Sequence, residues 1–295
     1  MENAMLYVIL NPSAQKGHAA QREQAVRAAL QNAELSFELA RTEFSGHAQK
    51  LAAAAAEQDR YSAVVAVGGD GTINEVVNGL LGSSTPLGLI PIGTGNDLVK
   101  MIDLPPNRPL LAAQRLRDGT PRPVDVGVAN GRAFINGLGC GFDAQIAVEN
   151  QRPSRLRGFA VYLAALLRAL RHYQAPSMRV HFDGQTVEQP MLLTTIGNGR
   201  CHGGGFWVTP DAQLDDGQFD VCLCAAMRLD EILRHVPKVI RGTHARLKQV
   251  RMARAREVTI EAAAPVPVHL DGEILGAALQ QVTVEIRPGA IKLLA

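Results

Sequence analysis

Short apolar runs alternate with helix-forming segments over the first third of the chain. The runs at residues 6–10, 36–41, 63–67 and 87–92 predict strands, and the segments at 21–30, 48–57, 73–81 and 97–102 predict helices. Strands that alternate with helices build a parallel sheet covered on both faces, and such sheets bind ligands beyond the carboxyl ends of their strands. The pattern therefore predicts an α/β ligand-binding domain.

The pattern changes near residue 121, where short strand-like runs replace the alternation. These runs lie at residues 124–128, 133–136, 179–182, 191–196, 219–224, 258–261, 266–270 and 282–286, and helices are expected only at 158–173 and 230–241. Such spacing predicts a mostly antiparallel domain, either a sandwich or a flattened barrel. We place the α/β domain at residues 1–123 and the β-rich domain at 124–287. Residues 288–295 either end the second domain or return to the first.

The composition is that of a folded, water-soluble protein. Apolar residues make up 46% of the 295 residues and charged residues 20%, close to the globular average. The longest apolar runs fall short of the ~18 residues that a membrane span needs. The first ten residues lack the basic start and the cleavage site of a secretory signal. We therefore expect a cytoplasmic protein.

The net charge of +2 creates no global field, but basic residues gather in two places. One cluster comprises Arg152, Arg155, Arg157, Arg168 and Arg171, and the other comprises Arg241, Arg246, Lys248, Arg251, Arg254 and Arg256. Neither cluster carries a nucleic-acid-binding motif or stacking aromatic residues, so nucleic acid is not an expected partner. An anionic surface and an ordinary solvated face both fit the two clusters.

The most informative segment is the glycine turn at residues 68–74, where a buried strand leads into a helix. Glycines let backbone N–H groups approach an anion at the amino terminus of the helix, where the helix dipole favours negative charge. The turn lacks the Lys-Ser/Thr ending of a Walker loop, and Asn74 stands where the dinucleotide fingerprint has its third glycine. It therefore predicts a phosphate site of another kind.

Asp70 lies inside this turn and changes its interpretation. A carboxylate repels a phosphate unless a cation lies between them, so Asp70 indicates Mg²⁺-assisted phosphoryl transfer rather than simple cofactor binding. The alternative is a tight turn in which Asp70 only caps the helix.

Three further loops are expected at the same edge of the sheet. Asn11 follows the first strand and Thr42 the second, while Gly93-Thr94-Gly95-Asn96-Asp97 follows the fourth. Thr94 and Asn96 can donate hydrogen bonds to phosphate oxygens, and Asp97 is a second carboxylate. Because the carboxyl ends of parallel strands meet at one edge, we expect four loops to converge there.

In the β-rich domain, Asp271-Gly272-Glu273 follows the strand expected at 266–270. Carboxylates near a polyphosphate serve as a general base or as metal ligands. The alternative is an ordinary hairpin turn, for which Asp-Gly is a common pair.

These motifs resemble those of the diacylglycerol kinase catalytic-domain family, and most of all its stand-alone bacterial lipid kinases. The resemblance rests on the Gly68–Glu75 turn, Pro91-x-Gly-Thr-x-Asn-Asp97, Phe134-Ile-Asn136 with Gly139-x-Gly141-Phe-Asp143, Gly197-Asn198, Gly203–Gly205, Pro210-x-Ala212, Asp216-Gly217-x-Phe-Asp220 and Asp271-Gly-Glu273. The motifs occur in family order over residues 8–275. Two departures are Ala14-Gln15, where the family has Ser-Gly, and Val99-Lys100, where it has Ala-Arg.

The resemblance implies an ATP-dependent lipid kinase with a Rossmann-like nucleotide domain, related to those of phosphofructokinases and NAD kinases, and a β-sandwich that closes the cleft. The implied nucleotide-binding residues are Asn11, Thr42, Gly68, Gly69, Asp70, Gly71, Thr72, Ile73, Asn74, Glu75 and Thr94. The implied catalytic residues are Asp70 at the Mg²⁺-phosphate centre and Asp271 and Glu273 near the acceptor hydroxyl, with Glu273 as the base.

The resemblance also implies a Mg²⁺ site in the second domain. Its ligands would be the side chain of Asp216 and the backbone carbonyls of Gln213 and Gln218, with Asp97 and Asp125 in the surrounding network. The implied partners are ATP and a lipid acceptor reached at the inner face of the membrane, and a homodimer is compatible with this interpretation.

Two alternatives stay open. A kinase of the same fold could act on a sphingoid base or NAD, and a non-catalytic nucleotide sensor could retain the fold. The helix at 158–173 has an apolar side surrounded by arginines, which fits an anionic membrane interface and packing against the sandwich equally well.

Overall fold

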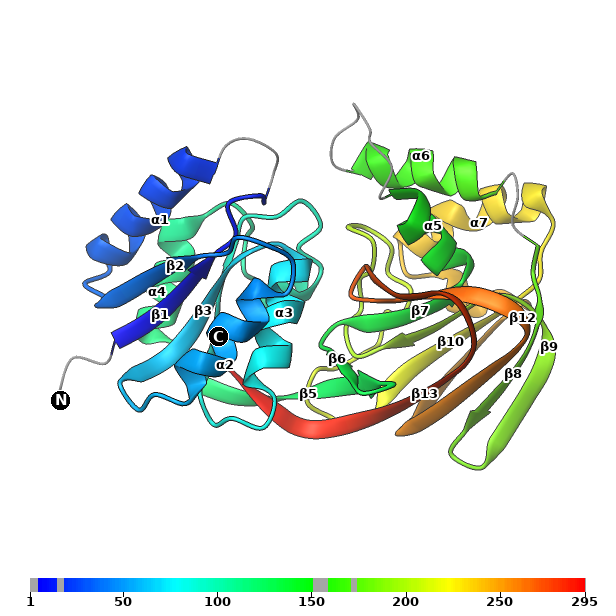
Figure 1. Ribbon diagram of the computed structural model, residues 1–295. Coiled ribbons are helices and arrows are strands. Elements are labelled where there is room, and N and C mark those ends of the chain that lie inside the picture. The colour runs from blue at the N-terminus through cyan, green and yellow to red at the C-terminus, as the bar shows by residue number, and fades with distance from the viewer. Residues whose placement is uncertain (1–4, 15–18, 151–158, 171–173, 295) are drawn as a thin grey trace. The chain divides into compact units, whose positions relative to one another are not determined.

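The computed structural model describes residues 5–14, 19–150, 159–170 and 174–294. Its first unit, Met1–Asp125 with Pro288–Ala295, alternates strands and helices (Figure 1). In chain order the elements are β1 (Met5–Leu10), α1 (Ala19–Asn32), β2 (Phe37–Arg41), α2 (His47–Ala56), β3 (Tyr61–Gly68), α3 (Asp70–Leu80), β4 (Leu87–Pro91), the 3₁₀ turn η1 (Leu98–Ile102) and α4 (Pro109–Asp118).

The strands of the first unit form a parallel sheet in the order β4-β3-β1-β2. Helix α1 packs with α4 and helix α2 with α3, so that the two pairs cover opposite faces of the sheet (Figure 1). β4 is buried along its whole length and β3 at all but one position, as a sheet covered on both faces requires. The predicted α/β architecture is confirmed.

One helix of this unit differs from the sequence-based expectation, and another was not expected at all. The helix expected at 97–102 is only the 3₁₀ turn η1, because Asn96 before it and Asp103 after it both adopt the left-handed region. The sequence analysis also missed α4, which begins at Pro109, a residue favoured in the first turn of a helix.

The second unit, Val126–Arg287, consists mainly of antiparallel strands. Its elements are the end of β5 (Pro121–Ala129), then β6 (Arg132–Phe134), β7 (Gly137–Gly141), α5 (Phe142–Asn150), α6 (Phe159–Ala169), β8 (Ser177–Phe182), β9 (Gln185–Gly197), β10 (Phe219–Ala225), α7 (Leu229–Ile240), η2 (His244–Arg246), β11 (Val250–Ala255), β12 (Glu257–Leu270) and β13 (Glu273–Leu294).

The long strands β9 and β12 give the second unit its sandwich form. Each pairs with β8 over its amino-terminal half and with β7 over its carboxyl-terminal half. The two strands therefore pass from one layer to the other around a core that includes Phe134, Phe182 and Phe219. Helices α5, α6 and α7 lie together on one side of the strands (Figure 1). The sequence analysis did not expect α5, which begins directly after β7 within a glycine-rich motif.

β13 begins in the second unit and ends in the first. Its last residues lie beside β4 in parallel, with Leu293 opposite Leu87. Ile291 and Leu293 are buried there, so the end of the chain completes the core of the first unit. No helix in the described ranges is long and apolar enough to cross a membrane.

We expect Leu293→Ala to lower the free energy of unfolding by about 2–5 kcal/mol, because truncating a buried leucine removes apolar contacts and leaves a cavity. Lys292→Ala, at the exposed neighbouring position, is the control and should change stability little. Urea titrations followed by circular dichroism measure both variants. Equal stability of the two variants would show that the terminal strand does not support the core.

Candidate active site

The carboxyl edge of the parallel sheet brings together four loops, as the sequence predicts. Asn11 after β1 donates from Nδ2 to Oγ1 of Thr72 on α3, at 3.0 Å. The backbone N–H of Thr42, after β2, donates to the carbonyl of Leu10 at 2.9 Å. The N–H of Gly93, after β4, donates to the carbonyl of Gly68 at 3.1 Å. These hydrogen bonds join the ends of all four strands.

Glycines make the close approach of two of these loops possible. A Cβ atom on Gly93 would lie 2.4 Å from the Cα atom of Gly69, and one on Gly68 would lie 2.3 Å from Oγ1 of Thr72. Real Cβ atoms essentially never show contacts this short, so a side chain at position 93 would push the two loops apart, and one at position 68 would displace the Thr72 side chain within the β3–α3 turn. The amino terminus of α3 therefore meets the 92–97 loop across bare backbone, which suits an anion held by N–H groups.

Asp70 connects the same two loops through its side chain. Its Oδ1 accepts a hydrogen bond from the backbone N–H of Asp97 at 2.8 Å. Its Oδ2 faces Gly95, on which a Cβ atom would lie only 2.6 Å away. This half-buried carboxylate at the first position of α3 is a hard oxygen donor beside the cradle that the glycines of the two loops form, and it fits Mg²⁺ brought by a nucleotide.

The remaining polar residues of this edge are either exposed or already hydrogen-bonded within the protein. Thr94 is exposed. Asp97 is largely buried and its Oδ1 lies 2.8 Å from Nζ of Lys100. Asn74 is buried, and its side-chain oxygen accepts a hydrogen bond from Asn78 at 3.3 Å. Thr94 is therefore the residue among these whose side chain a ligand can reach most easily.

Glu75, which the resemblance assigns to the nucleotide, has a different task in the structure. Its two carboxylate oxygens accept the backbone N–H groups of Gly46 and Ala48, at 2.8 and 3.0 Å. A carboxylate at this position satisfies N–H groups at the start of α2 that have no partner within the helix. Glu75 thereby fixes the loop that follows Thr42.

Arg22 is a residue of this edge that the sequence analysis missed. From α1 its guanidinium donates to the carbonyl of Ile92 at 3.1 Å and to Oδ1 of Asn107 at 2.6 Å. It places a positive charge beside the 92–97 loop. No local motif marks it, because only the fold brings α1 to the end of β4.

In the second unit, Asp271-Gly272 is a two-residue hairpin turn between β12 and β13. Both residues have positive φ, 50° and 88°, as the type I′ turn requires. The carboxylate of Asp271 accepts the backbone N–H groups of Ile135, Asn136 and Gly137 at 2.8–3.0 Å. Asp271 therefore fixes the turn to the loop before β7.

Glu273 follows this turn as the first residue of β13 and is exposed. Among the described residues its carboxylate has no hydrogen-bond or ion-pair partner. The turn thus presents one carboxylate that is fully used by backbone donors and one that is open to a substrate.

The buried side chain of His269 also holds the hairpin turn in place. Nδ1 of His269 accepts the N–H of Gly272 at 3.2 Å. Burial lowers the pKa of His269 to about 3, so the ring is neutral and carries its proton on Nε2.

Burial also raises the pKa of Asp143 to about 7, although Thr195 donates a hydrogen bond to its Oδ2 at 2.7 Å. His269 and Asp143 both border Gly139.

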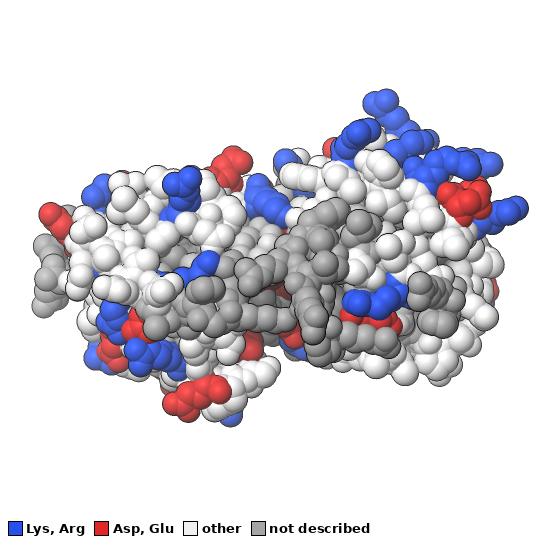
Figure 2. All heavy atoms as spheres, turned by 90° about the horizontal axis from the view of Figure 1, so that it is seen from above, with Lys and Arg blue, Asp and Glu red and all other residues white. Residues whose placement is uncertain are grey.

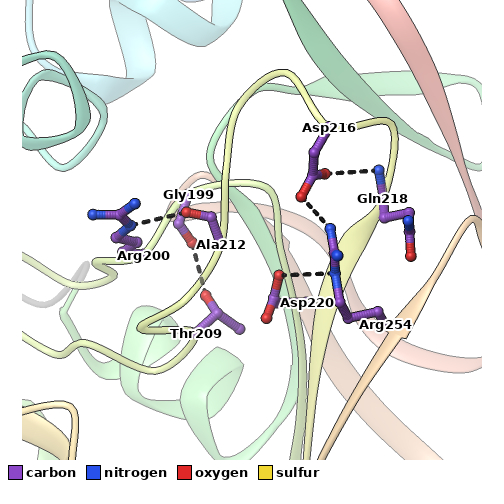
Figure 3. Close-up of polar contacts among 8 residues, drawn as sticks. All are labelled: Gly199, Arg200, Thr209, Ala212, Asp216, Gln218, Asp220 and Arg254. Atoms are coloured by element: carbon purple, nitrogen blue, oxygen red, sulfur yellow. Dashed lines mark hydrogen bonds and ion pairs between the residues drawn. The ribbon is translucent and has the colours of Figure 1, made fainter.

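In the loop that the resemblance implies as a second Mg²⁺ site, the guanidinium of Arg254 lies at the carboxylate of Asp216. Oδ1 of Asp216 accepts the N–H of Gln218 at 3.0 Å, and Oδ2 contacts the guanidinium of Arg254 (Figure 3). Nε of Arg254 also lies 4.0 Å from Oδ2 of Asp220, whose pKa burial raises to about 6. Both oxygens of Asp216 thus have partners, and a divalent cation there would meet a guanidinium. As the side chains lie, this loop does not fit Mg²⁺.

Asp97 and Asp125, the implied network residues, belong to the first unit. Asp125 is buried, and its Oδ1 accepts the N–H of Gly289 at 2.8 Å. Asp125 thereby ties the returning end of the chain to β5. Within the described ranges, no group of three or more His, Cys, Asp or Glu side chains could hold a metal ion.

Comparison with known proteins identifies the family. The description "Diacylglycerol kinase catalytic domain" matches residues 5–129 and "YegS C-terminal NAD kinase beta sandwich-like domain" matches residues 136–295. The diacylglycerol kinase of Bacillus subtilis (strain 168) is 33% identical over 81% of this chain and 82% of its own. That of Staphylococcus aureus (strain bovine RF122 / ET3-1) is 32% identical over 91% and 86%.

Solved structures show the same fold. The crystal structure of a diacylglycerol kinase from Bacillus anthracis str. Sterne has a TM-score of 0.76 at 23% identity, covering 99% of this chain and 96% of that one. A second structure from the same organism reaches 0.80 at 24% identity, covering 99% and 97%. The matching catalytic-domain description and the named relatives make this chain a kinase. The chain belongs to the diacylglycerol kinase family.

We expect the thermal stability of the protein without nucleotide to be the same in Mg²⁺ and in EDTA, because Arg254 already neutralises Asp216. Arg254→Ala should lower the melting temperature in EDTA and regain part of the loss in Mg²⁺, since the variant exposes the carboxylate. Arg256→Ala removes the same charge from a neighbouring exposed position and serves as the control. A clear stabilisation of the unchanged protein by Mg²⁺ would contradict this account.

Proposed function

We propose that the chain transfers the γ-phosphoryl group of ATP to the hydroxyl group of a lipid, and that diacylglycerol is the first acceptor to test. The observation that carries the proposal is the glycine cradle at the start of α3, with Asp70 inside it. The relatives named diacylglycerol kinase support the choice of acceptor.

The nucleotide half of the reaction belongs to the first unit. An α-helix supplies no i−4 carbonyl for its first N–H groups, so the amino terminus of α3 suits phosphate oxygens. Thr94 adds an exposed hydroxyl group, and Asn11 holds Thr72 in place. Asp70 is the residue that would hold Mg²⁺, which in phosphoryl transfer neutralises the charge that develops between the β- and γ-phosphates.

The acceptor half belongs to the hairpin turn of the second unit. The oxygen of the lipid hydroxyl loses its proton as its bond to phosphorus forms, and a carboxylate within hydrogen-bond reach can accept that proton. Glu273 is exposed and open, whereas Asp271 is occupied by three N–H donors. We therefore assign the base to Glu273 and a positioning role to Asp271.

Turnover of ATP with a panel of acceptors tests the proposed function. Diacylglycerol in mixed micelles should be phosphorylated, and sphingosine and NAD should not. Asp70→Asn keeps an oxygen that can accept the N–H of Asp97 but removes the charge, so it should retain the fold and lose at least about 100-fold in turnover. Phosphorylation of NAD or sphingosine alone would replace the acceptor, and nucleotide binding without any turnover would indicate a sensor.

Glu273→Gln should lower kcat by roughly 100-fold or more while the Kd for ATP stays within about twofold, because a base acts only in the transfer step. Glu257→Gln, at an exposed position on β12, is the matched control and should leave both constants unchanged. Steady-state kinetics and calorimetric ATP binding measure them. A parallel loss of ATP affinity and turnover would place Glu273 in the nucleotide site instead.

A further inference from the structure

A row of three residues crosses the sheet of the second unit close to the hairpin turn between β12 and β13. His269 on β12 lies opposite Gly139 on β7, which lies opposite Thr195 on β9. Their neighbours along the strands belong to the core cluster of the sandwich, as Leu138 and Leu270 do. Because successive side chains of a strand point to opposite faces, the row faces the other side, where α5 packs on the same three strands. Gly139 leaves the middle of the row without a side chain.

The side chain of Asp143, from the first turn of α5, occupies the space over Gly139. Thr195 donates its hydroxyl hydrogen to Oδ2 of Asp143 at 2.7 Å, and the backbone N–H of Ala144 donates to Oδ1 at 2.8 Å. A Cβ atom on Gly139 would lie 2.4 Å from Oδ2 of Asp143 and 2.3 Å from Nε2 of His269. Those two atoms are therefore no more than the sum of these distances, 4.7 Å, apart. The carboxylate of Asp143 thus lies near one nitrogen of the His269 ring.

The other nitrogen of this ring holds the hairpin turn. Nδ1 of His269 accepts the N–H of Gly272 at 3.2 Å. Gly272 is the second residue of the turn, with a φ of 88°, and Glu273 follows it directly. A fixed N–H limits rotation of the turn, so His269 limits the directions in which Glu273 leaves it.

This hydrogen bond requires one particular form of the His269 ring. A neutral imidazole has one nitrogen that donates and one that accepts. Nδ1 can accept the N–H of Gly272 only when the ring proton is on Nε2, and a carboxylate near Nε2 favours the proton there. When Asp143 is protonated, that attraction is lost. The alternative form of the ring carries its proton on Nδ1, and it would place two donors opposite each other at Gly272.

Other titratable groups also face this pair. Among the described residues they are the thiols of Cys140, Cys222 and Cys224, near Asp143, and the ring of His202, near His269. Burial raises the pKa of all three thiols, so they stay protonated near neutral pH. Burial raises the pKa of Asp143 to about 7. Asp143 and His202 are therefore the two groups of this set that can change charge near neutral pH.

Lysine and arginine side chains of this unit gather on its surface. Figure 2, which looks down on the helices of the second unit, shows Lys and Arg at one end of that surface. The arginines that the sequence places around the helix expected at 158–173 lie outside the described residues; they are Arg152, Arg155, Arg157 and Arg171. Lysine and arginine keep their charge up to about pH 10, so those drawn add no titration near neutral pH.

We propose that Asp143 and His269 are positioning residues for Glu273: the carboxylate of Asp143 keeps the ring proton of His269 on Nε2, and Nδ1 then holds the turn from which Glu273 projects. The pair acts through the N–H of Gly272 rather than on the substrate. The inference rests on the proposed function, since it gives the pair a task in the step for which Glu273 is the base. The deprotonated form of Asp143 is the active one, so turnover should fall as the pH decreases through the pKa of Asp143.

Substitutions of His269 test the hydrogen bond to the turn. His269→Asn keeps an acceptor, the amide oxygen, near the position of Nδ1 and should retain kcat within about threefold of the unchanged protein. His269→Leu removes the acceptor and should lower kcat by about tenfold or more, while the Kd for ATP stays within about twofold. Thermal melting checks that both variants fold. Equal kcat in the two variants would overturn the role of Nδ1.

The pH profile of kcat tests Asp143, because a purely structural role would not make turnover follow its ionisation. For the unchanged protein kcat should rise by about fivefold or more between about pH 6 and about pH 8. Asp143→Asn cannot ionise and should lose most of this rise, whereas His202→Gln should keep it and serves as the matched control. Retention of the full rise in Asp143→Asn, or its loss in His202→Gln, would assign the titration to another group and overturn the pair.

Nitrogen NMR of the full-length protein with isotope-labelled histidine separates this inference from the proposed function. The two ring nitrogens give distinct signals according to which one carries the proton, and the spectrum of His269→Asn identifies the signals of His269. The proton should be on Nε2 at about pH 8 and partly on Nδ1 below about pH 6. Absence of lipid phosphorylation would contradict the proposed function without changing these signals. A proton on Nδ1 at about pH 8 would overturn the positioning pair.

Discussion

The candidate site depends on one contact, the approach of the β3–α3 turn to the 92–97 loop without side chains between them. Gly69 and Gly93 make that approach sterically possible, and the hydrogen bond from Asp97 to Asp70 fixes it. The same bond orients the Asp70 carboxylate, so the group that would meet a metal ion also closes the cradle. The same few atoms therefore hold the two loops together and set the position of the Asp70 carboxylate. A change in either loop alters the contact between the loops and the geometry of the candidate site.

The sequence predicts this half of the molecule well because its signals are local. Alternating apolar runs and amphipathic segments define β1 to β4 with α1 to α3, and parallel strands must then bring their carboxyl ends together. The helix expected at 97–102 is wrong because the backbone conformation of the flanking residues does not allow the helix that the side-chain pattern indicates. The segment after Asn96 has helical spacing, yet residues with positive φ at both of its ends limit it to a single 3₁₀ turn.

The partners of the site carboxylates could not be predicted, because they depend on contacts between residues far apart in the chain. Glu75 caps α2, Asp271 binds the loop before β7, and Asp216 pairs with Arg254. Each lies in a motif that the family resemblance links to substrate or metal, and each instead satisfies backbone or arginine donors. A motif therefore indicates a region of the fold more securely than the role of each oxygen within it. Glu273, which the resemblance already implies as the base, is exposed and open in the structure.

Helices α6 and α7 show the same limit for amphipathic patterns. Both pack on one apolar cluster, and the sequence of the more apolar α6 fits a membrane interface and packing against the sandwich equally well. Among the described side chains of α6, Leu166 and Ala169 are buried in this cluster, so that part of its apolar side serves packing within the unit. In α7 the apolar positions 229, 232, 233 and 236 form one stripe, in which Ile232 and Val236 pack against the cluster and Leu229 and Leu233 are exposed. The contacts that the fold supplies, rather than the hydrophobicity of a segment, therefore decide which of its apolar positions are buried and which stay exposed.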